Sequence, residues 1–508
     1  MGNIRRQSII SSVVIYIGFA VGLLNTYFFT REGGSFTPDE YGLTSIFIAI
    51  ATLMMAFSTM AMPSYIFKFY HYYGDHLPPK KNDMITWAVL VSTIGFILVM
   101  IAGWVFKDIV IRKFGEHSPL LLNYYYWIFP MGFGLTIYTI LEAYAWSMGR
   151  PVLTSFLKEV EWRLITTVLI VLLAMGVIKD FDLFIKLYAF TFAAIALTLV
   201  LYLIFTKKIH FTFSVSKVSR RYFKKILSLC LFFYSGALIF TISQVFDSIV
   251  IASVLDDGLA KAGIFGLAQI MTSVIQAPQR SIIAASITHL SRAWKEKDMK
   301  LLQKIYQRSS INLLIFAVGI FILIALNYTE AVTTFQLKDT YLLGFNAFIF
   351  LGLTKVIDLG TGVNSQIIAT SNYWRFELIS GVVLLFVMIP STYFLTKEYD
   401  LTGPAIANLI SISVYNIIRI IFLWKKFKLF PFTLNSLYTL LIGTVGFMIC
   451  YFGLNTIHGI GGMFLRSILF IILYGGAILM FKLSPDIQPV MQTIMKRLRL
   501  KPPSDFPR

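Results

Sequence analysis

The sequence predicts an all-α integral membrane protein with about fourteen transmembrane helices, in two pseudo-repeated six-helix lobes followed by two C-terminal helices. Hydrophobic segments of about twenty residues recur from Ser8 to Lys482, and a helix of that length crosses a hydrocarbon core about 30 Å thick. The composition agrees, because 57% of the residues are hydrophobic and only 14% are charged. The stretches between the segments are too short to form a separate soluble domain.

The predicted spans follow one another with short connections. They cover residues 9–29, 42–63, 84–106, 120–146, 160–178, 184–206, 226–253, 262–284, 309–327, 341–363, 377–396, 404–424, 437–456 and 465–482. The first apolar run is too long for the core of a signal peptide and lacks a small-residue cleavage site, so we expect it to be retained as a helix. An even number of spans places both termini on one side.

The charges predict which side that is. Roughly thirty cations fall in loops on the side of the termini and about nine on the other, which is a positive-inside bias. The basic loops and tail contain Lys68, Lys80, Lys81, Arg150, Lys158, residues 207–225 and 292–308, Lys425, Lys426, Lys428, Lys496, Arg497, Arg499 and Lys501. The opposite loops contain Asp39, Glu40, Asp108, Asp180, Asp256, Asp257, Asp339 and Asp400. We expect a bacterial cytoplasmic (inner) membrane protein with both termini cytoplasmic.

This bias also accounts for the net charge of +19 without a nucleic-acid partner. Basic loops next to a membrane attract anionic lipids, which are expected partners here. Cys230 and Cys450 lie in separate apolar spans and form neither a metal-ligand spacing nor a disulfide framework. We find no P-loop, zinc motif or nucleophile elbow, so no cofactor and no enzymatic activity are expected.

A faint internal repeat predicts the domain organisation. The stretches TPDEYGLTSIF (37–47) and LAKAGIFGLAQI (259–270) each place an aromatic-Gly pair at the start of a helix, and EAYAWSMGRP (142–151) resembles QIIATSNYWR (366–375) weakly. We expect an N-lobe at 1–206, a basic cytoplasmic linker at 207–225 and a C-lobe at 226–424. Spans thirteen and fourteen and a basic tail fill 425–508. Repeated lobes are typical of transporters that work by alternating access.

The chain resembles the multidrug/oligosaccharidyl-lipid/polysaccharide (MOP) flippase superfamily, and within it the exporters of lipid-linked O-antigen or capsule units. The resemblance rests on the six-plus-six-plus-two span pattern and on four motifs: FTPDEYG (36–42), SMGRP (147–151), QVFDSIVIASVL (244–255) and AGIFG (262–266). It covers essentially the whole chain. It implies a transporter that flips an undecaprenyl-pyrophosphate-linked oligosaccharide, such as a lipopolysaccharide repeat unit, with polysaccharide assembly proteins as possible partners and H+ or Na+ as the unassigned coupling ion.

Ionisable residues inside spans are the first candidates for a substrate or ion site, because each is costly in lipid and usually faces a cavity or a partner. Asp247 lies in span seven, with Ser243 and Gln244 on the same helical face. The alternative is a structural hydrogen bond from Asp247 to a neighbouring helix. The resemblance favours a functional role, since an acid recurs at this place in the superfamily.

Span ten supplies a second group of candidates. Lys355 and Asp358 have the i, i+3 spacing of an intrahelical ion pair, and Asn364 continues the polar character. A buried cation is also the natural partner of a lipid pyrophosphate, so a structural and a substrate-binding interpretation stay open.

Other charges within spans lie near span ends. Arg163, with Glu159 and Glu161, is a candidate cytoplasmic gate. Long cationic side chains at such positions also reach the interface by snorkelling, and this is the expectation for Arg163, Arg280, Arg419, Lys186 and Arg466. Glu142 ends span four and is expected to pair with Arg150.

Several functions compete with flipping of a polysaccharide unit. A membrane-embedded glycosyltransferase or polymerase needs a catalytic cluster in a sizeable outer loop, and the outer loops here are short. Multidrug exporters of the superfamily commonly carry an acid in span one, where this chain has Asn25 and Thr26. Lipid II flippases carry arginines inside spans one and two, where this chain has only Arg31 in the loop between them. The sequence therefore favours polysaccharide export.

Overall fold

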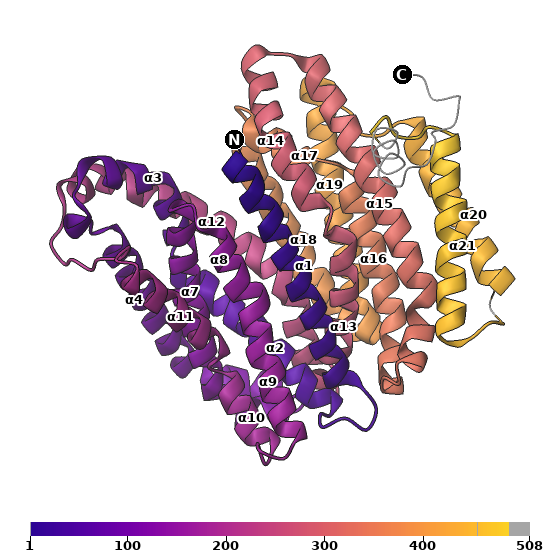
Figure 1. The fold of residues 1–508 in the computed structure, drawn as a ribbon, viewed down its shortest axis with the longest axis horizontal. Coiled ribbons are helices and arrows are strands. Elements are labelled where there is room, and N and C mark those ends of the chain that lie inside the picture. The colour runs from indigo at the N-terminus through magenta and orange to yellow at the C-terminus, as the bar shows by residue number, and fades with distance from the viewer. Residues whose placement is uncertain (1, 455, 487–508) are drawn as a thin grey trace. The chain divides into compact units, whose positions relative to one another are not determined.

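The computed structural model describes residues 2–454 and 456–486 and, within them, the side chains other than those of 2–9, 12, 280, 281, 284, 285 and 288. Every regular element among these residues is a helix, which confirms the all-α fold class. The chain forms two compact units: unit 1 ends at Gly266 and unit 2 begins at Leu267 (Figure 1). The predicted C-terminal cations from Lys496 to Lys501 and the side chain of Arg280 lie outside the described part.

Unit 1 contains the helices up to the start of α13. They are α1 (Gly2–Thr30), α2 (Pro38–Thr59), α3 (Met62–His76), η1 (Pro79–Lys81), α4 (Met84–Val105), α5 (Lys107–Phe114), α6 (Pro119–Asn123), η2 (Tyr125–Trp127), α7 (Ile128–Ser147), α8 (Pro151–Phe156), η3 (Leu157–Glu161), α9 (Trp162–Ala174), α10 (Phe181–Tyr188), α11 (Thr191–Phe205) and α12 (Lys217–Val254). Helix α13 (Gly258–Gln276) continues into unit 2.

Unit 2 continues with long helices joined by short turns. They are α14 (Gln279–Glu296), α15 (Met299–Thr334), η4 (Asp339–Leu343), α16 (Gly344–Gly360), α17 (Asn364–Thr370), α18 (Arg375–Tyr399), η5 (Asp400–Thr402), α19 (Gly403–Phe427), α20 (Leu434–Leu454) and α21 (Gly459–Met480). Helices α20 and α21, which follow the repeat, pack on α15 and on each other.

The described chain has 12 helical segments that are long and apolar enough to cross a membrane. One of them, Arg375–Phe427, contains both α18 and α19. A further uninterrupted helix runs from Pro151 to Ala174 through α8, η3 and α9, but four charged residues between 158 and 163 keep it out of the twelve. Counting these two features restores the fourteen crossings predicted from the sequence. The protein is therefore a multi-pass membrane protein.

The order of helices repeats along the chain. A separate helix, α3 or α14, follows the second span of each half, and the short helices α8 and α17 follow the fourth. Glycines in the left-handed region, Gly149 and Gly362, occupy the turns before α8 and α17. The weakly similar stretches 142–151 and 366–375 do not occupy equivalent places, because 142–151 contains the Gly149 turn before α8 whereas 366–375 begins after the Gly362 turn. The connection between the predicted spans 42–63 and 84–106 is largely helical, because α3 and η1 fill it.

The FTPDEYG motif builds the start of α2. Thr37 and Glu40 form a reciprocal capping box, in which the Thr37 hydroxyl accepts from the Glu40 amide at 3.2 Å and the Glu40 carboxylate accepts from the Thr37 amide at 2.7 Å. Pro38 occupies the first helical turn. Glycine is needed at position 42, because a Cβ there would lie 1.7 Å from the carbonyl oxygen of Leu259. The motif thus brings α2 into backbone contact with the start of α13.

Part of the predicted linker is anchored and helical. Residues 207–216 precede α12, and α12 itself begins at Lys217. Asp83 is fully buried and accepts hydrogen bonds from the Ser216 amide at 2.8 Å and the Ser219 hydroxyl at 2.8 Å. The Ser219 hydroxyl also bonds that of Tyr73 at 2.7 Å, and burial raises the pKa of this phenol, which keeps it neutral. The start of α12 is therefore fixed to unit 1.

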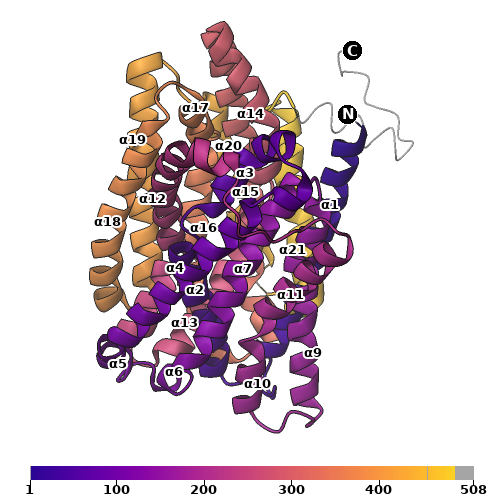
Figure 2. The ribbon, with the colours of Figure 1, turned by 90° about the vertical axis from the view of Figure 1, so that its left-hand side faces the viewer.

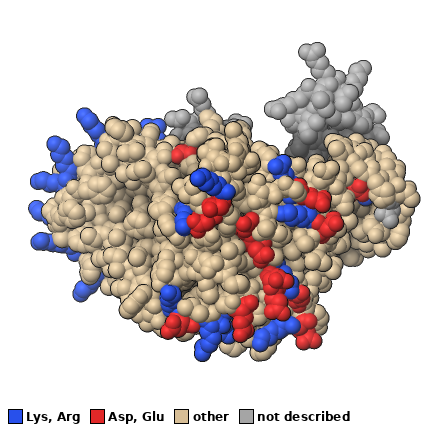
Figure 3. Space-filling model, turned by 90° about the horizontal axis from the view of Figure 1, so that it is seen from below, with Lys and Arg blue, Asp and Glu red and all other residues tan. Residues whose placement is uncertain are grey.

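The two ends of unit 1 carry different helices. Helices α5, α6 and α10 lie at one end and α3 at the other (Figure 2). Acidic side chains, interspersed with basic ones, lie at the α10 end, which Figure 3 views from below. They include Asp39 and Glu40 in the first turn of α2, Asp108 of α5, Asp182 of α10 and the exposed Asp256. Which end faces the cytoplasm stays a prediction.

Gly42→Ala tests the close approach of α2 to the backbone at Leu259. A methyl group at 1.7 Å from a carbonyl oxygen forces the backbones apart, and overpacking of this kind typically costs about 1–3 kcal/mol. We expect a lower yield of monodisperse protein in detergent and a lower melting temperature. Gly74→Ala is the matched control, because a Cβ at Gly74 meets nothing within 4 Å. Equal behaviour of the two variants would contradict the packing described here.

Candidate functional site

Polar side chains gather inside unit 2 where α16, α17, α18 and α19 meet. The turn after α16 positions them. Gly362 has a φ of 69°, and a Cβ there would lie 2.8 Å from the Ser309 hydroxyl oxygen, so only glycine fits this turn against α15. The Ser310 hydroxyl donates to the Gly360 carbonyl at 2.5 Å and holds the end of α16 in place. The turn thereby directs Thr361 and Asn364 towards α19.

Asn416 of α19 is the centre of this network and is 1% exposed. Its amide nitrogen donates to the Asp358 carboxylate at 3.0 Å. Its amide oxygen accepts from the Thr361 hydroxyl at 3.1 Å and from the Asn364 side chain at 2.8 Å. All four side chains are therefore joined by hydrogen bonds, as buried polar groups must be.

The network continues to a buried ion pair. The Ser365 amide donates to Asn364 at 2.5 Å, and the Ser365 hydroxyl donates to the Glu377 carboxylate at 2.7 Å. Arg419, which is 3% exposed, binds the same Glu377 carboxylate and the hydroxyl of Tyr415. Buried charges of opposite sign stabilise each other only when they stay paired in this way.

Three polar atoms at the edge of this network have no hydrogen-bond partner among the described residues. They are the second carboxylate oxygen of Glu377, the Nε of Arg419 and the hydroxyl of Tyr306. A buried polar atom without a partner costs about 1–3 kcal/mol, so such atoms often mark places where water or a ligand binds. These three atoms can therefore still form hydrogen bonds with water or a ligand inside a membrane domain.

Lys355 and Asp358 take different hydrogen-bond partners. The Lys355 ammonium donates to the Gln276 side chain of α13 at 3.0 Å, and Gln276 donates in turn to Gln279 at 2.8 Å. Asp358 binds Asn416 instead. The i, i+3 spacing permits an ion pair between them, but the helices packed around α16 offer each side chain another partner.

The gate candidates lie together in unit 1. Arg163 forms an ion pair with Glu159 at 2.8 Å, and Glu161 accepts from the Thr198 hydroxyl of α11 at 2.7 Å. Asn25 of α1 donates to the Arg163 carbonyl at 2.8 Å and accepts from Thr167 at 2.6 Å.

Close packing of α1 brings these groups together. A Cβ at Gly18 would lie 2.3 Å from the Glu159 carbonyl oxygen, and one at Gly22 would lie 3.0 Å from the Arg163 Nε. Small residues four apart allow such an approach between membrane helices. The segment η3 that carries Glu159 and Glu161 is a π-helical turn, a feature frequent at functional sites.

Asp247 is buried and engaged in interactions, at 1% exposure in α12. Its two predicted companions lie in different surroundings: Gln244 is exposed, and the half-buried Ser243 donates to the Phe240 carbonyl at 2.8 Å. The polar face predicted for this helix therefore runs from an exposed amide to a buried carboxylate. Asp247, Gln244 and Ser243 belong to unit 1, whereas Lys355, Asp358 and Asn364 belong to unit 2.

Three expectations about charges near span ends are wrong. Arg419 does not snorkel, because it is buried against Glu377. Arg466 is 6% exposed and pairs with Glu330 of α15 at 3.2 Å. Glu142 pairs with Lys158 at 3.5 Å rather than with Arg150. For the two arginines, a carboxylate on another helix replaces the solvent that snorkelling would reach.

Sequence reasoning missed Asn416, Glu377 and the functional interest of Arg419. The signal was present, since Asn416 and Arg419 interrupt an otherwise apolar span at i, i+3 and polar residues in spans are costly. The chain segments that the structure describes hold no group of three or more His, Cys, Asp or Glu side chains placed for a metal ion.

Comparisons with known structures identify the fold. The lipid II flippase MurJ in an inward closed conformation matches with a TM-score of 0.73 at 13% identity, covering 93% of this chain and 99% of that one. An inward-facing MATE multidrug transporter of the MOP superfamily matches with a TM-score of 0.62 at 15% identity, over 82% of this chain and 94% of that one. An outward-facing form gives 0.54 at 16% identity, over 83% and 95%. At these identities the likeness establishes the fold.

The family follows from the sequence comparison. Residues 4–294 match the family model described as polysaccharide biosynthesis protein. The chain belongs to this family, within the MOP flippase superfamily, and shares the fold of the flippase and transporter structures above. No curated protein matches it significantly.

Two double-mutant cycles test the partners described for unit 2. Glu377→Leu or Arg419→Met alone leaves a lone buried charge, at a cost of about 3–5 kcal/mol, so the combined variant should recover much of the loss in melting temperature. Lys355→Met and Asp358→Leu remove hydrogen bonds to different helices. The loss in melting temperature of the double variant should therefore approach the sum of the two single losses. Thermal unfolding of the purified variants measures both cycles. A Lys355/Asp358 double variant as stable as the parent would contradict the partners described here.

Proposed function

We propose that the protein flips a lipid-linked oligosaccharide, a polysaccharide repeat unit, across the bacterial cytoplasmic membrane by alternating access, with both termini cytoplasmic. The observation that carries the proposal is the concentration of charged and amide side chains within membrane-spanning helices of a chain from the polysaccharide biosynthesis family. Such residues are expensive in lipid and usually serve a substrate or ion pathway. Polysaccharide assembly proteins are proposed partners, and H+ or Na+ is the proposed coupling ion.

Each of the two units contributes a distinct chemistry to this proposal. A sugar needs hydroxyl and amide partners, and a pyrophosphate needs cations. Lys355 is a cation within a span of unit 2, and the network around Asn416 offers amides and hydroxyls beside it in the same helix bundle. Asp247 in unit 1 is a buried acid suited to ion coupling. We propose these residues as contacts of substrate and coupling ion, and Glu159, Glu161 and Arg163 as a gate.

Asp247→Asn tests the mechanism. The purified full chain would be reconstituted in liposomes that carry a fluorescent undecaprenyl-pyrophosphate oligosaccharide, and a membrane-impermeant quencher would report its movement between leaflets. We expect the parent to accelerate flipping over protein-free liposomes and the variant to lose about tenfold or more of that rate, as an ion-site lesion should. Asp108→Asn, which removes an exposed acid from α5, is a control for loss of charge alone.

Two outcomes would contradict the proposal. If the parent moves a cationic dye but not the lipid-linked oligosaccharide, the protein is a multidrug exporter. If it moves lipid II and not a polysaccharide repeat unit, the proposed substrate is wrong. Full activity of Asp247→Asn at matched reconstitution would remove this carboxylate from the mechanism while leaving the substrate assignment intact.

A further inference from the structure

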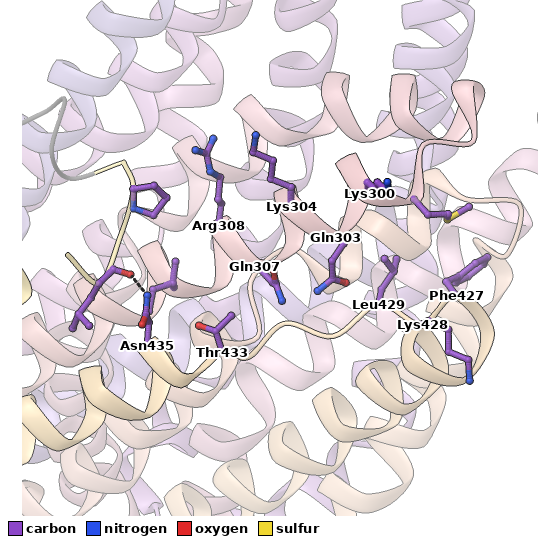
Figure 4. A pocket seen from close by; sticks show the side chains of 14 residues that line it. Lys300, Gln303, Lys304, Gln307, Arg308, Phe427, Lys428, Leu429, Thr433 and Asn435 are labelled. Atoms are coloured by element: carbon purple, nitrogen blue, oxygen red, sulfur yellow. Dashed lines mark hydrogen bonds between the residues drawn. The ribbon is translucent and has the colours of Figure 1, made fainter. Parts of the chain in front are cut away.

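A basic pocket of about 540 Å³ lies within unit 2, away from the polar network (Figure 4). Its walls come from three places: the first turns of α15, the segment between α19 and α20, and the segment after α21. The proposed transport function uses none of these residues. The pocket is therefore a separate feature that requires its own explanation.

Four cations line the pocket, and its lining contains no carboxylate. Lys300, Lys304 and Arg308 follow one another at i, i+4 and i+8, which places them on one face of α15. Lys428 follows the end of α19, and its side chain points away from α15. Arg308 has a carboxylate partner, Asp486, at 3.9 Å. Lys300, Lys304 and Lys428 form no ion pair with any described residue, so the pocket keeps a concentrated positive charge.

The walls are fixed before any ligand arrives. The Gln303 side chain donates to the Phe430 carbonyl at 2.7 Å and accepts from the Phe430 amide at 3.0 Å. Asn435 donates to the Leu483 carbonyl at 3.0 Å and ties the third wall to the second. A pocket that is already ordered loses little freedom on binding, which favours affinity. The half-buried amide of Gln307 makes no hydrogen bond with the described residues and faces into this space.

The floor of the pocket is apolar. Leu429 and Leu483 are each 1% exposed, and Ile311 and Phe427 also line the space. Along α15 the sequence changes at Ile311 from the basic turns to the apolar run that crosses the membrane. A pocket at this level is placed at the membrane interface, where cations meet lipid phosphates and apolar side chains meet acyl chains.

We propose that this pocket binds the phosphate-bearing headgroup of an anionic membrane phospholipid. The phosphate lies beside Lys300 and Lys304 of α15, the Gln307 amide donates to headgroup oxygens, and the apolar floor takes the start of an acyl chain. Inorganic phosphate carries the same negative charge as the headgroup, but it has no apolar part to contact the floor of the pocket. The C-terminal tail is an unsuitable occupant, because Lys496, Arg497, Arg499 and Lys501 give it the same sign of charge as the walls.

The test compares two double variants of the full chain in detergent. Lys300→Gln/Lys304→Gln removes two charges from the pocket, and Lys80→Gln/Lys81→Gln removes two exposed charges from η1 of unit 1. Native mass spectrometry with added phosphatidylglycerol or phosphatidylethanolamine measures retained lipid. Each cation near an anionic lipid contributes about 1 kcal/mol, so the pocket variant should lose roughly tenfold or more of its phosphatidylglycerol affinity, and the control variant little. Parent protein should retain phosphatidylglycerol over phosphatidylethanolamine.

A second measurement separates lipid from free phosphate and guards against misfolding. Thermal unfolding without lipid should give the pocket variant a melting temperature at or above that of the parent, because removing like charges relieves repulsion. Phosphatidylglycerol should then raise the melting temperature of the parent more than that of the pocket variant. Stabilisation of the parent by inorganic phosphate to the same extent would overturn the assignment to a lipid. Equal loss of phosphatidylglycerol in both double variants would overturn the pocket as a specific site.

Discussion

Charged and amide side chains inside the membrane-spanning helices need partners within the protein, and the packing of this chain depends on that constraint. Lipid offers no hydrogen bonds, so an unpaired charge or amide there costs several kcal/mol. The buried Arg419 meets Glu377, Arg466 meets Glu330, and Asn416 satisfies three neighbours at once. These pairs select which helices pack together in unit 2.

The same constraint explains the tight packing in unit 1. Gly18 and Gly22 let α1 approach the charged π-helical turn closely enough for Asn25 to bond the Arg163 carbonyl. Without that approach Arg163 and Glu159 would face lipid rather than protein. The charges at 158–163 are thus tolerated because small residues stand opposite them.

Much of the fold follows from local rules that act along the sequence. Apolar segment length predicts the spans, and the turn at Gly149 and the capping box at Thr37 explain two of the motifs that carry the resemblance. The resemblance to the MOP superfamily was right, as the family match establishes. The sequence predicts these features because each depends on residues that are neighbours along the chain.

The partners of individual charges depend on tertiary packing, and there the sequence was insufficient. Arg419 lies near a span end, where snorkelling and pairing are equally compatible with its position, and only the approach of α18 to α19 decides for Glu377. Lys355 and Asp358 have ideal ion-pair spacing, yet they form hydrogen bonds with Gln276 and Asn416 of other helices instead. The residue pattern of one helix does not show which side chain of a neighbouring helix will pack against it.

Alternating access is the central claim, and Gln244 provides the most direct measurement of it. This residue is exposed on α12 three positions before Asp247. A Gln244→Cys variant, made after both native cysteines are replaced by alanine, would be labelled in oriented vesicles with a membrane-impermeant maleimide applied to either side. The account predicts labelling from one side in the resting protein and a shift towards the other side when lipid-linked oligosaccharide is added. Equal labelling from both sides at all times would contradict it.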